Sequence, residues 1–310
     1  MEPWKQRLLP LMPAAVASVL SSVPDDAPLL EIRIRQDRPL ELVFDGYDRI
    51  VYGADARPMT DRAACERLLA RFTEHSRYAW ENELTNGFIT LGGGYRVGLA
   101  GRMQRANGTP TRFSSVTGFC IRIAREVKGA AIPLAPWLNE NGALCSTLLV
   151  GQPGSGKTTV LRDLIRLASD GLCGFTPCRV AVADERFELC GADDGGTAFD
   201  LGARTDVLAG IKKADAMQRL IAALSPQVLA TDELNETADI DALLRARGCG
   251  VTVVATAHGR GMEELAMRKA LHRLAKERVF FRIVLLEGRG CVRAVLDGDG
   301  QALKTAEESP

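Results

Sequence analysis

The sequence Gly-Gln-Pro-Gly-Ser-Gly-Lys-Thr at residues 151–158 constrains the fold more than any other feature of the chain. It follows an apolar run of β-type residues and precedes a helical pattern, which is the strand–loop–helix context of a P-loop. Gly151, Gly154 and Gly156 permit turns that point successive backbone N–H groups at one anion. The amino end of the following helix adds the positive end of its dipole. The sequence therefore predicts a site for the phosphates of a nucleoside triphosphate.

Individual residues of this loop have separate expected roles. Lys157 can reach the β- and γ-phosphates, and the hydroxyl of Thr158 can hold Mg²⁺. We therefore expect ATP and Mg²⁺ as cofactors. The predicted nucleotide-binding residues run from the end of the strand into the first helical turn: Gly151, Gln152, Pro153, Gly154, Ser155, Gly156, Lys157, Thr158 and Thr159.

Length, charge and cysteine spacing narrow the class of protein. A chain of 310 residues is long enough for two domains. Lys+Arg and Asp+Glu both number 39, so no net charge draws the chain toward nucleic acid, and we expect no nucleic-acid partner. The eight cysteines include no C-x-x-C pair, so neither zinc spacing nor a disulfide framework is indicated.

The first twenty residues imitate a signal peptide, because basic residues precede the apolar run 8–16. Two prolines interrupt that run, and Leu8, Met12, Val16 and Leu20 recur at helical spacing. We therefore expect a retained core or docking helix. No run reaches the ~20 apolar residues of a membrane span, so we predict no transmembrane segment. The need for ATP favours a cytoplasmic location.

The pattern of the chain changes twice. Residues 1–130 mix alternating strands with helical segments and predict a smaller α+β N-terminal domain. Residues 131–143 are rich in Pro, Gly and Asn and are the predicted linker. Residues 144–310 alternate strands with helices, which predicts an α/β fold with a mostly parallel sheet, a RecA-like P-loop ATPase core. The polar tail after Asp299 is expected to fray.

The expected elements can be given by residue. In the first domain they are strands at 31–35, 39–44 and 118–127, a helix from a Thr60 cap to about 75, and a hairpin over 88–99 with glycines at its turn. In the second they are strands at 144–150, 179–184, 227–232, 251–258, 279–287 and 291–297, the last at the sheet edge, and helices at 157–169, 213–224, 238–247 and 262–276.

An acid pair ends the apolar strand 227–232. Asp232 is the predicted Walker B aspartate, which acts on Mg²⁺ through its water shell. Glu233 is the predicted general base that orients and deprotonates the attacking water. The alternative is a pair of solvated acids at the end of a strand.

A second acidic segment follows the strand 179–184. A strand inserted between the P-loop strand and the Asp232 strand is typical of RecA and AAA proteins, and its acidic end would lie near the phosphates. Glu188 or Glu185 could therefore share the role of base, or both could be surface charges on a loop.

The strand 251–258 is expected beside the P-loop strand, so that Thr256 and His258 would face the γ-phosphate. Open α/β sheets bind ligands at the carboxyl ends of their strands, where His258 lies. His258 is thus a candidate sensor, and a structural histidine is the alternative. Residues 212–215 (Lys-Lys-Ala-Asp) lack the Asn of the guanine-selecting N-K-x-D motif and precede the Asp232 strand, which favours ATP over GTP.

These motifs occur in the order of a known family. The matching segments are Gly151–Thr159, Asp184–Arg186, Gly202–Leu208, Ser225–Glu233 and Ala255–Gly259 in the second domain, and Glu31–Arg35, Ser76–Tyr78, Gly87–Gly98 and Ile121–Glu126 in the first. Over about residues 20–290 the chain resembles the stage III sporulation protein AA family, sporulation ATPases related to type II and type IV secretion ATPases.

The resemblance implies an ATPase of endospore-forming bacteria in the cytoplasm of the mother cell. It implies a hexameric ring that lies peripherally at the membrane through a membrane-protein partner and energises an envelope-spanning channel complex. By the same resemblance, 184–188 matches the aspartate box of secretion motors and 256–258 their histidine box. The pair Asn235-Glu236 departs from the family pattern, in which a small residue and a basic one are expected.

A positive charge on the γ-phosphate completes such a site. Arg204, Arg186, Arg122 and Arg125 are candidate arginine fingers, and each could instead form a structural salt bridge. The predicted function is an ATP-hydrolysing motor. The alternatives are an ATPase that acts on nucleic acid, like a helicase loader or recombinase, and a scaffold that binds ATP without hydrolysing it. An aromatic content of 5% disfavours the first, and intact Glu233 and His258 disfavour the second.

Overall fold

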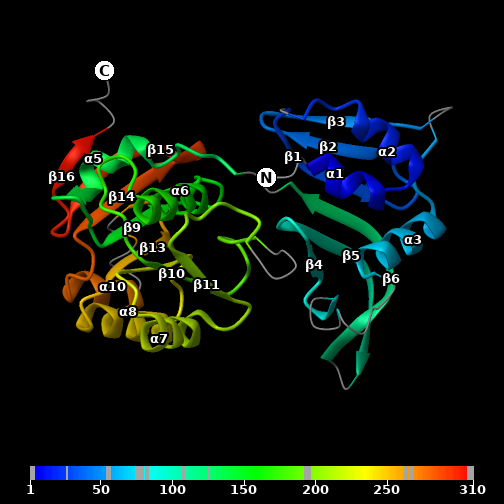
Figure 1. The fold of residues 1–310 in the computed structure, drawn as a ribbon. Helices are drawn as coiled ribbons and strands as arrows, with labels where there is room; N and C mark the ends of the chain where they lie inside the picture. The colour runs from blue at the N-terminus through cyan, green and yellow to red at the C-terminus, as the bar shows by residue number, and fades with distance from the viewer. Residues whose placement is uncertain are drawn as a thin grey trace. The chain divides into compact units, whose positions relative to one another are not determined.

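The computed structural model describes residues 4–25, 27–53, 57–74, 80, 84–106, 109–123, 126–191, 197–261, 264 and 269–305. The chain divides into two compact units (Figure 1). The first comprises Met1–Arg125 and Gly191–Ala198, and the second comprises Glu126–Cys190 and Phe199–Pro310.

The first unit is an antiparallel sheet with helices packed on one face. Its strands lie in the order β3-β2-β1-β6-β5-β4. The bounds are Leu29–Arg35 (β1), Leu40–Phe44 (β2), Tyr47–Val51 (β3), Phe88–Leu91 (β4), Tyr95–Ala106 (β5) and Thr109–Arg122 (β6), with helices Trp4–Leu8 (α1), Ala14–Ser21 (α2) and Arg62–Phe72 (α3). The β4–β5 hairpin turns at Gly93 and Gly94, both at positive φ, as predicted. The strands β5 and β6 are longer than predicted.

The apolar residues near the N-terminus belong to the core of this unit. Leu8, Met12, Val16 and Leu20 are all buried in one cluster with the sheet. The expected single helix is instead broken into α1 and α2 around a 3₁₀ turn, because the prolines interrupt its hydrogen bonds. Among the described residues, no helix has the length and apolarity needed to cross a membrane.

The start of α3 differs by one residue from the prediction. The Asp61 carboxylate accepts the backbone N–H of Ala64 at 2.7 Å, so Asp61 is the cap. The hydroxyl of Thr60, the predicted cap, donates to the carbonyl of Arg35. The expected end of this helix at His75 lies outside the described residues.

The second unit is built on a mixed sheet in the order β11-β10-β12-β13-β9-β14-β15-β16. In this spatial order, all the strands from β11 as far as β14, including β9 and β10, run parallel. The last two strands, β15 and β16, pair in antiparallel fashion. The bounds are Thr147–Gly151 (β9), Val180–Asp184 (β10), Thr205–Ala209 (β11), Val228–Thr231 (β12), Thr252–His258 (β13), Arg282–Glu287 (β14), Cys291–Asp297 (β15) and Ala302–Thr305 (β16), with helices Lys157–Asp170 (α6), Lys213–Leu224 (α7), Thr237–Gly248 (α8) and Lys269–Lys276 (α10).

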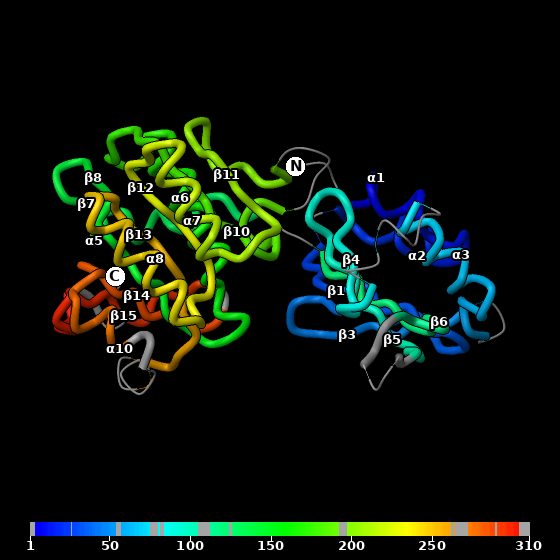
Figure 2. The backbone as a smooth tube through the Cα atoms, turned by 90° about the horizontal axis from the view of Figure 1, so that it is seen from below, coloured from blue at the N-terminus to red at the C-terminus, as the bar shows by residue number. Residues whose placement is uncertain are grey.

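Helices cover both faces of this sheet, which explains why its strands are continuous apolar runs. Along β9, Leu148 and Val150 pack in the core cluster that includes α7, α8 and α10. Leu149, between them, packs in the opposite cluster with α6. Figure 1 shows these two helical layers above and below the strands, and Figure 2, seen from below, shows α7, α8 and α10 along one face.

The predicted linker at 131–143 is not a spacer in the structure. A 3₁₀ turn (η3, Ile132–Leu134) and a short helix (α5, Ala135–Leu138) begin with prolines near their first positions, where proline suits a helix. Leu134 and Leu138 are buried in the core of the second unit with α6. The short strands β7 (Asn139–Glu140) and β8 (Ala143–Leu144) then pair with each other.

Three further differences concern the edges and the order of the sheet. The strand β11 was not predicted, and β16 pairs with β15 in the tail that was expected to fray. The strand between the P-loop strand β9 and β12 is β13, not β10, which lies beyond β12. The helix expected over 262–276 is described from Lys269, and most of the residues before it lie outside the described part of the chain.

Candidate nucleotide site

The P-loop backbone has the conformation that its glycines predict. Gly154 and Gly156 lie at φ 76° and 90°, in the left-handed region that favours glycine. A Cβ on Gly151 would lie 2.3 Å from Oγ of Ser155, so this position has no room for a side chain. Helix α6 begins directly after Gly156. The loop therefore places the amino end of α6 at the carboxyl end of β9, which is a favourable site for phosphate.

The Lys157 side chain is buried against the P-loop. Its Nζ donates to the carbonyls of Gly151 and Gln152, both at 2.8 Å, and lies 3.3 Å from Nδ1 of His258. Burial lowers the pKa of Lys157, and the nearby Glu233 carboxylate opposes that shift. Lys157 thus contacts His258 and interacts electrostatically with Glu233.

Sheet register brings the second half of the site to the same edge. His258 at the end of β13 lies opposite Gly151, and β12 ends one strand further, just before Asp232 and Glu233. Because parallel strands present their carboxyl ends at one edge, residues far apart in the sequence meet there. The structure thus brings together Lys157, Asp232, Glu233 and His258.

Glu233 has an unusual backbone. Its φ is 37°, a left-handed value that costs a residue with a side chain about 1–3 kcal/mol. Its N–H donates to Oγ1 of Thr256 at 2.7 Å, and the next N–H, of Leu234, donates to the Thr256 carbonyl at 2.9 Å. Thr256 was expected to face the γ-phosphate. It is instead buried, with its hydroxyl used to hold the Glu233 backbone.

The Glu233 carboxylate lies 2.8 Å from Nε2 of His258. With the Lys157 ammonium donating to Nδ1, the contacts fit a neutral imidazole whose Nε2–H donates to Glu233. Burial alone would raise the pKa of Glu233. Hydrogen bonds from Asn235 and His258, together with the charge of Arg186, outweigh burial and lower that pKa. Glu233 is therefore ionised at neutral pH, in the form that can accept a proton.

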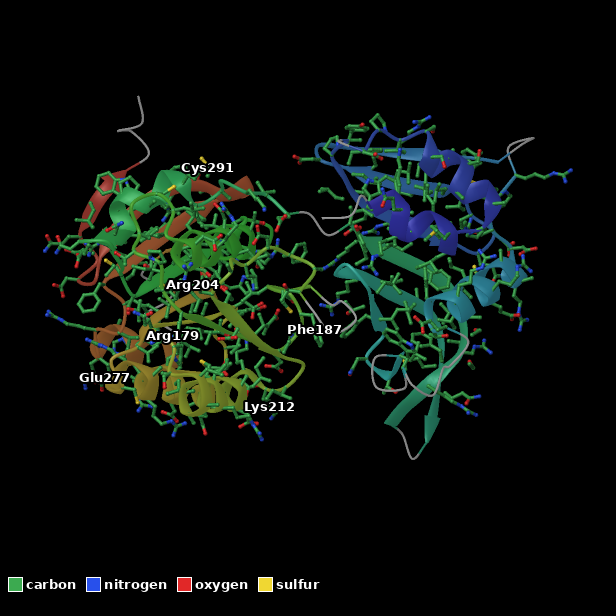
Figure 3. The ribbon with its side chains drawn as sticks, viewed as in Figure 1. Arg179, Phe187, Arg204, Lys212, Glu277 and Cys291 are labelled. Carbon is green, nitrogen blue, oxygen red and sulfur yellow. The ribbon has the colours of Figure 1, made fainter. Side chains whose placement is uncertain are left out.

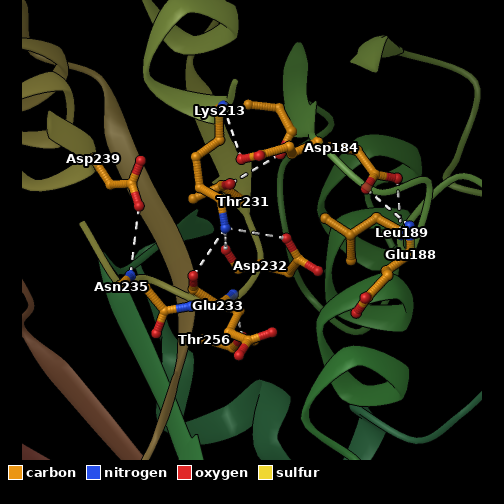
Figure 4. A network of polar contacts seen from close by, with 12 residues as sticks. Asp184, Glu188, Leu189, Lys213, Thr231, Asp232, Glu233, Asn235, Asp239 and Thr256 are labelled. Carbon is orange, nitrogen blue, oxygen red and sulfur yellow. Dashed lines mark hydrogen bonds and ion pairs between the residues drawn. The ribbon is translucent and has the colours of Figure 1, made fainter. Parts of the chain in front are cut away.

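Asp232 is almost fully buried, and its carboxylate lies beside the Lys213 ammonium (Figure 4). Burial raises its pKa to about 7, the Lys213 ammonium 3.8 Å away opposes this, and the carboxylates of Asp184 and Glu188 add to it. A cation would relieve this excess of negative charge, so the donor set fits Mg²⁺. No three acidic, histidine or cysteine side chains of the described residues form a preformed metal cage. A P-loop site fits this finding, because phosphates and water supply most Mg²⁺ ligands.

The three acidic residues at the end of β10 and in the loop after it, Asp184, Glu185 and Glu188, lie in different environments. The buried Asp184 carboxylate accepts the backbone N–H groups of Glu188, Leu189 and Cys190 at 2.8–2.9 Å, so it shapes the loop. Glu188 points its charge at Asp232 and raises the pKa of that residue. Glu185 instead lies 3.4 Å from the N–H of Lys213, at the start of α7.

Among the described residues, Arg186 is the only candidate arginine finger that lies at this edge. Arg204, labelled in Figure 3, precedes β11 at the amino end of the sheet and donates to the Ser169 carbonyl. Arg122 belongs to the first unit and lies 3.6 Å from Glu31, and Arg125 lies outside the described residues. Arg186 is exposed in the loop after β10, and its charge acts on Glu233.

An open pocket of about 390 Å³ adjoins the P-loop on the side of β14. It is lined by P-loop residues and by residues after β13 and β14, among them Gln152, Gly154, Arg260, Gly288 and Arg293. Glu233 and His258 lie on the other side of β9, toward β12 and β13. Sequence reasoning did not identify this pocket, because its walls come from four separate segments.

The parallel strands, the P-loop at the end of β9 and the acid pair after β12 define a class of structure, the RecA-like P-loop ATPase fold. Solved structures show the same fold. The pilus retraction motor PilT with bound ADP matches with a TM-score of 0.57 at 16% identity, over 94% of this chain and 83% of that chain. The ATPase DotB of Legionella pneumophila matches with a TM-score of 0.55 at 16% identity, over 84% and 72%.

Sequence comparison gives the family. The family model described as "Sporulation stage III, protein AA" matches residues 2–303. Stage III sporulation protein AA of Bacillus subtilis (strain 168) is 39% identical over 298 residues, which cover 94% of this chain and 95% of that protein. The chain therefore belongs to the stage III sporulation protein AA family, and the predicted resemblance is confirmed. A more distant relative, the ycf45 protein of Porphyra purpurea, is 28% identical over 180 residues, 58% of this chain and 31% of that protein.

Proposed function

We propose that this chain binds Mg²⁺–ATP and hydrolyses it. The observation that supports this most strongly is the placement of the Glu233 carboxylate, 2.8 Å from His258 and at the sheet edge where the P-loop ends. An ionised carboxylate beside the expected γ-phosphate is what a hydrolytic site needs and what a simple binding site does not.

The residues divide the chemistry among them. The backbone of 151–158 and the Lys157 ammonium bind the phosphates and offset the negative charge that develops there. Thr158 and Asp232 would hold the Mg²⁺, which neutralises phosphate charge when bound. Glu233 orients the attacking water and accepts its proton. His258, in contact with both Lys157 and Glu233, is placed to respond to the γ-phosphate.

The first test is phosphate release by the purified chain. We expect release with ATP and Mg²⁺, and none when a chelator removes the divalent cation. The phosphate-releasing activity should elute together with the protein in size-exclusion chromatography. Release that is equal with and without the chelator, or a complete absence of release with and without membranes, would contradict the proposal.

The pocket beside β14 is the proposed site of the nucleoside. With the γ-phosphate toward Glu233 and His258, the rest of the nucleotide extends the other way, toward Gly288. A Cβ on Gly288 would meet nothing within 4 Å, and its φ is unstrained, so Gly288→Leu adds bulk at the pocket wall without forcing the backbone. We expect the Kd for ATP to rise about tenfold.

Gly248→Leu is the matched control, because Gly248 also has open space around it and ends α8. Titration with a fluorescent ATP analogue measures both variants. Equal affinities for the two variants would place the nucleoside elsewhere.

Lys213 favours ATP over GTP as the substrate. Residues 212–215 match the guanine-selecting N-K-x-D motif only in part, and Lys213 occupies the position of the motif's lysine. Its ammonium is buried against the carbonyls of Asp232 and Glu233 and is not available to a base.

We propose further that the chain is a motor that works as a ring of six copies at a membrane channel. The class of structures it resembles includes a pilus retraction motor, and its family is named for sporulation. Its place would be the mother-cell cytoplasm, at the membrane through a membrane-protein partner. An arginine from a neighbouring copy would complete each site, because Arg204 lies at the opposite end of the sheet from its own P-loop.

The ring predicts that activity depends on assembly. Turnover per chain should rise with protein concentration. Mixing inactive Lys157→Ala chains with an inactive arginine variant, such as Arg204→Ala, should restore some phosphate release. At some subunit interfaces of the mixed ring, an intact P-loop from the arginine variant then meets an intact arginine from a Lys157→Ala chain. Turnover by a strict monomer, shown by sedimentation under assay conditions, would contradict the ring. Repeating the mixture with Arg186→Ala and Arg122→Ala would identify the finger.

A further inference from the structure

A buried lysine outside the P-loop binds the segment that carries the proposed base. Lys213 is the first residue of α7, and only 8% of its surface is exposed. Its Nζ donates to the carbonyl of Asp232 at 3.0 Å and to the carbonyl of Glu233 at 2.8 Å (Figure 4). An ammonium removed from water must be paired or hydrogen-bonded, and here the backbone of two site residues supplies those bonds.

The two carbonyls can share one ammonium only because the chain leaves the strand. Along a regular strand, successive carbonyls point to opposite sides. Glu233, at φ 37°, turns the chain, so that its carbonyl and that of Asp232 both reach Lys213. The lysine therefore stabilises the strained backbone conformation itself, not only a nearby charge.

Two other groups hold the same turn from other directions. Thr256 accepts the N–H of Glu233 and, through its carbonyl, the N–H of Leu234. The Asp239 carboxylate lies 3.2 Å from the N–H of Glu236 and 3.4 Å from that of Asn235. Lys213 differs from them because it supplies bonds to the carbonyls of the turn. Without it, these two acceptors, one buried and one partly buried, lose this donor.

We propose that Lys213 is the positioning residue of the catalytic base, which fixes the left-handed turn at Glu233 and thereby aims its carboxylate. This inference rests on the proposed hydrolysis. Lys213 would not touch the nucleotide. Its removal should therefore slow turnover without weakening ATP binding measured in the absence of Mg²⁺, where the Asp232 carboxylate 3.8 Å from Lys213 holds no metal.

The test compares Lys213→Met, which keeps the length of the side chain without its donors, with Lys212→Met. Lys212 is the exposed neighbour, labelled in Figure 3. We expect Lys213→Met to lower kcat about 10- to 100-fold, since a small misplacement of a reacting group has effects of this size. The Kd for ATP, measured in the absence of Mg²⁺, should stay near the wild-type value. Lys212→Met should behave as wild type.

A double variant distinguishes a role of Lys213 in positioning Glu233 from a general loss of structure at the site. If Lys213 acts through Glu233, then Lys213→Met should have little further effect on single-turnover rates in a Glu233→Gln background. Multiplicative effects in the double variant would overturn the proposal, as would wild-type kcat in Lys213→Met. Lys213→Gln retains N–H donors and should fall between Met and Lys. A glutamine variant that is folded but as slow as the methionine variant would also overturn it.

Hydrogen exchange tests the turn without using activity. The amide protons of Glu233 and Leu234 should exchange faster in Lys213→Met than in Lys212→Met, while the β9 amides keep their protection. Unchanged exchange at both amides would refute the proposal even if the chain hydrolyses ATP. Faster exchange in a chain without any ATPase activity would instead leave the turn correct and the proposed function wrong.

Discussion

Replacing Glu233 by glutamine should slow ATP hydrolysis ~10²–10⁴-fold while ATP still binds, which is the usual range for loss of a general base. Glutamine has nearly the same shape, and its Oε1 can still accept the Nε2–H of His258, whose present distance to the carboxylate is 2.8 Å. The Glu233 N–H to Thr256 is a backbone bond and is retained. What disappears is the ionised oxygen that accepts a proton from water.

Phosphate release and ATP affinity, measured side by side, check this result. Glu277→Gln is the matched control, because Glu277 is an exposed carboxylate on the surface of the same unit (Figure 3). Glu188→Gln is the informative comparison, since Glu188 also faces Asp232. A larger defect in Glu188→Gln, with Glu233→Gln near normal, would reverse the roles assigned to these residues.

Replacing Lys157 by alanine should reduce turnover to background. The ammonium is the cation of the P-loop itself, and its donors now satisfy the carbonyls of Gly151 and Gln152 and the ring of His258. Alanine removes the charge that would stabilise the phosphates in the transition state. It also removes the contact from Lys157 to His258, so the histidine loses one of the two groups that orient it.

Lys212→Ala is the control for Lys157→Ala, because it removes an exposed lysine from the same unit. Melting temperatures with and without ATP, together with phosphate release, distinguish lost catalysis from lost folding. Release at the wild-type rate from a folded Lys157→Ala chain would disprove the assignment of 151–158 as the active P-loop.

The parts of the site that could be predicted are those that depend on local sequence. The P-loop glycines, the apolar strand before Asp232 and the polar end of the 251–258 strand each follow from residues close in the chain. Parallel strands then place their ends at one edge, so Lys157, Glu233 and His258 meet as expected. The bounds of α7 and β15 also agree with the prediction.

The remaining parts depend on contacts between distant segments. Thr256 lies on the predicted strand, but its bond to the Glu233 N–H requires the turn at φ 37°, which the local sequence does not indicate. The sheet order puts β13, not β10, between the P-loop strand and β12, and periodicity cannot distinguish the two. The prolines of 131–143 suggest a spacer and instead begin short helices packed on α6.

The burial of Lys213 has a signal in the sequence of its own helix. Lys213 shares the helical spacing i, i+3, i+4 with Ala216 and Met217, both buried. A lysine on the apolar side of an amphipathic helix has to find partners inside the fold. That rule, applied to the helix predicted over 213–224, indicates a buried role for this lysine, although it does not indicate which carbonyls the ammonium binds.

The left-handed backbone of Glu233 has a consequence for how such a chain evolves. At φ 37°, glycine is the residue that the backbone favours, and glutamate is retained there at a cost in stability. Under the role in hydrolysis that we propose for Glu233, selection for turnover acts against a substitution that would make the fold more stable. In a lineage released from hydrolysis, this position would be among the first to drift to glycine. The residue at this position would then indicate whether a descendant protein still hydrolyses its nucleotide.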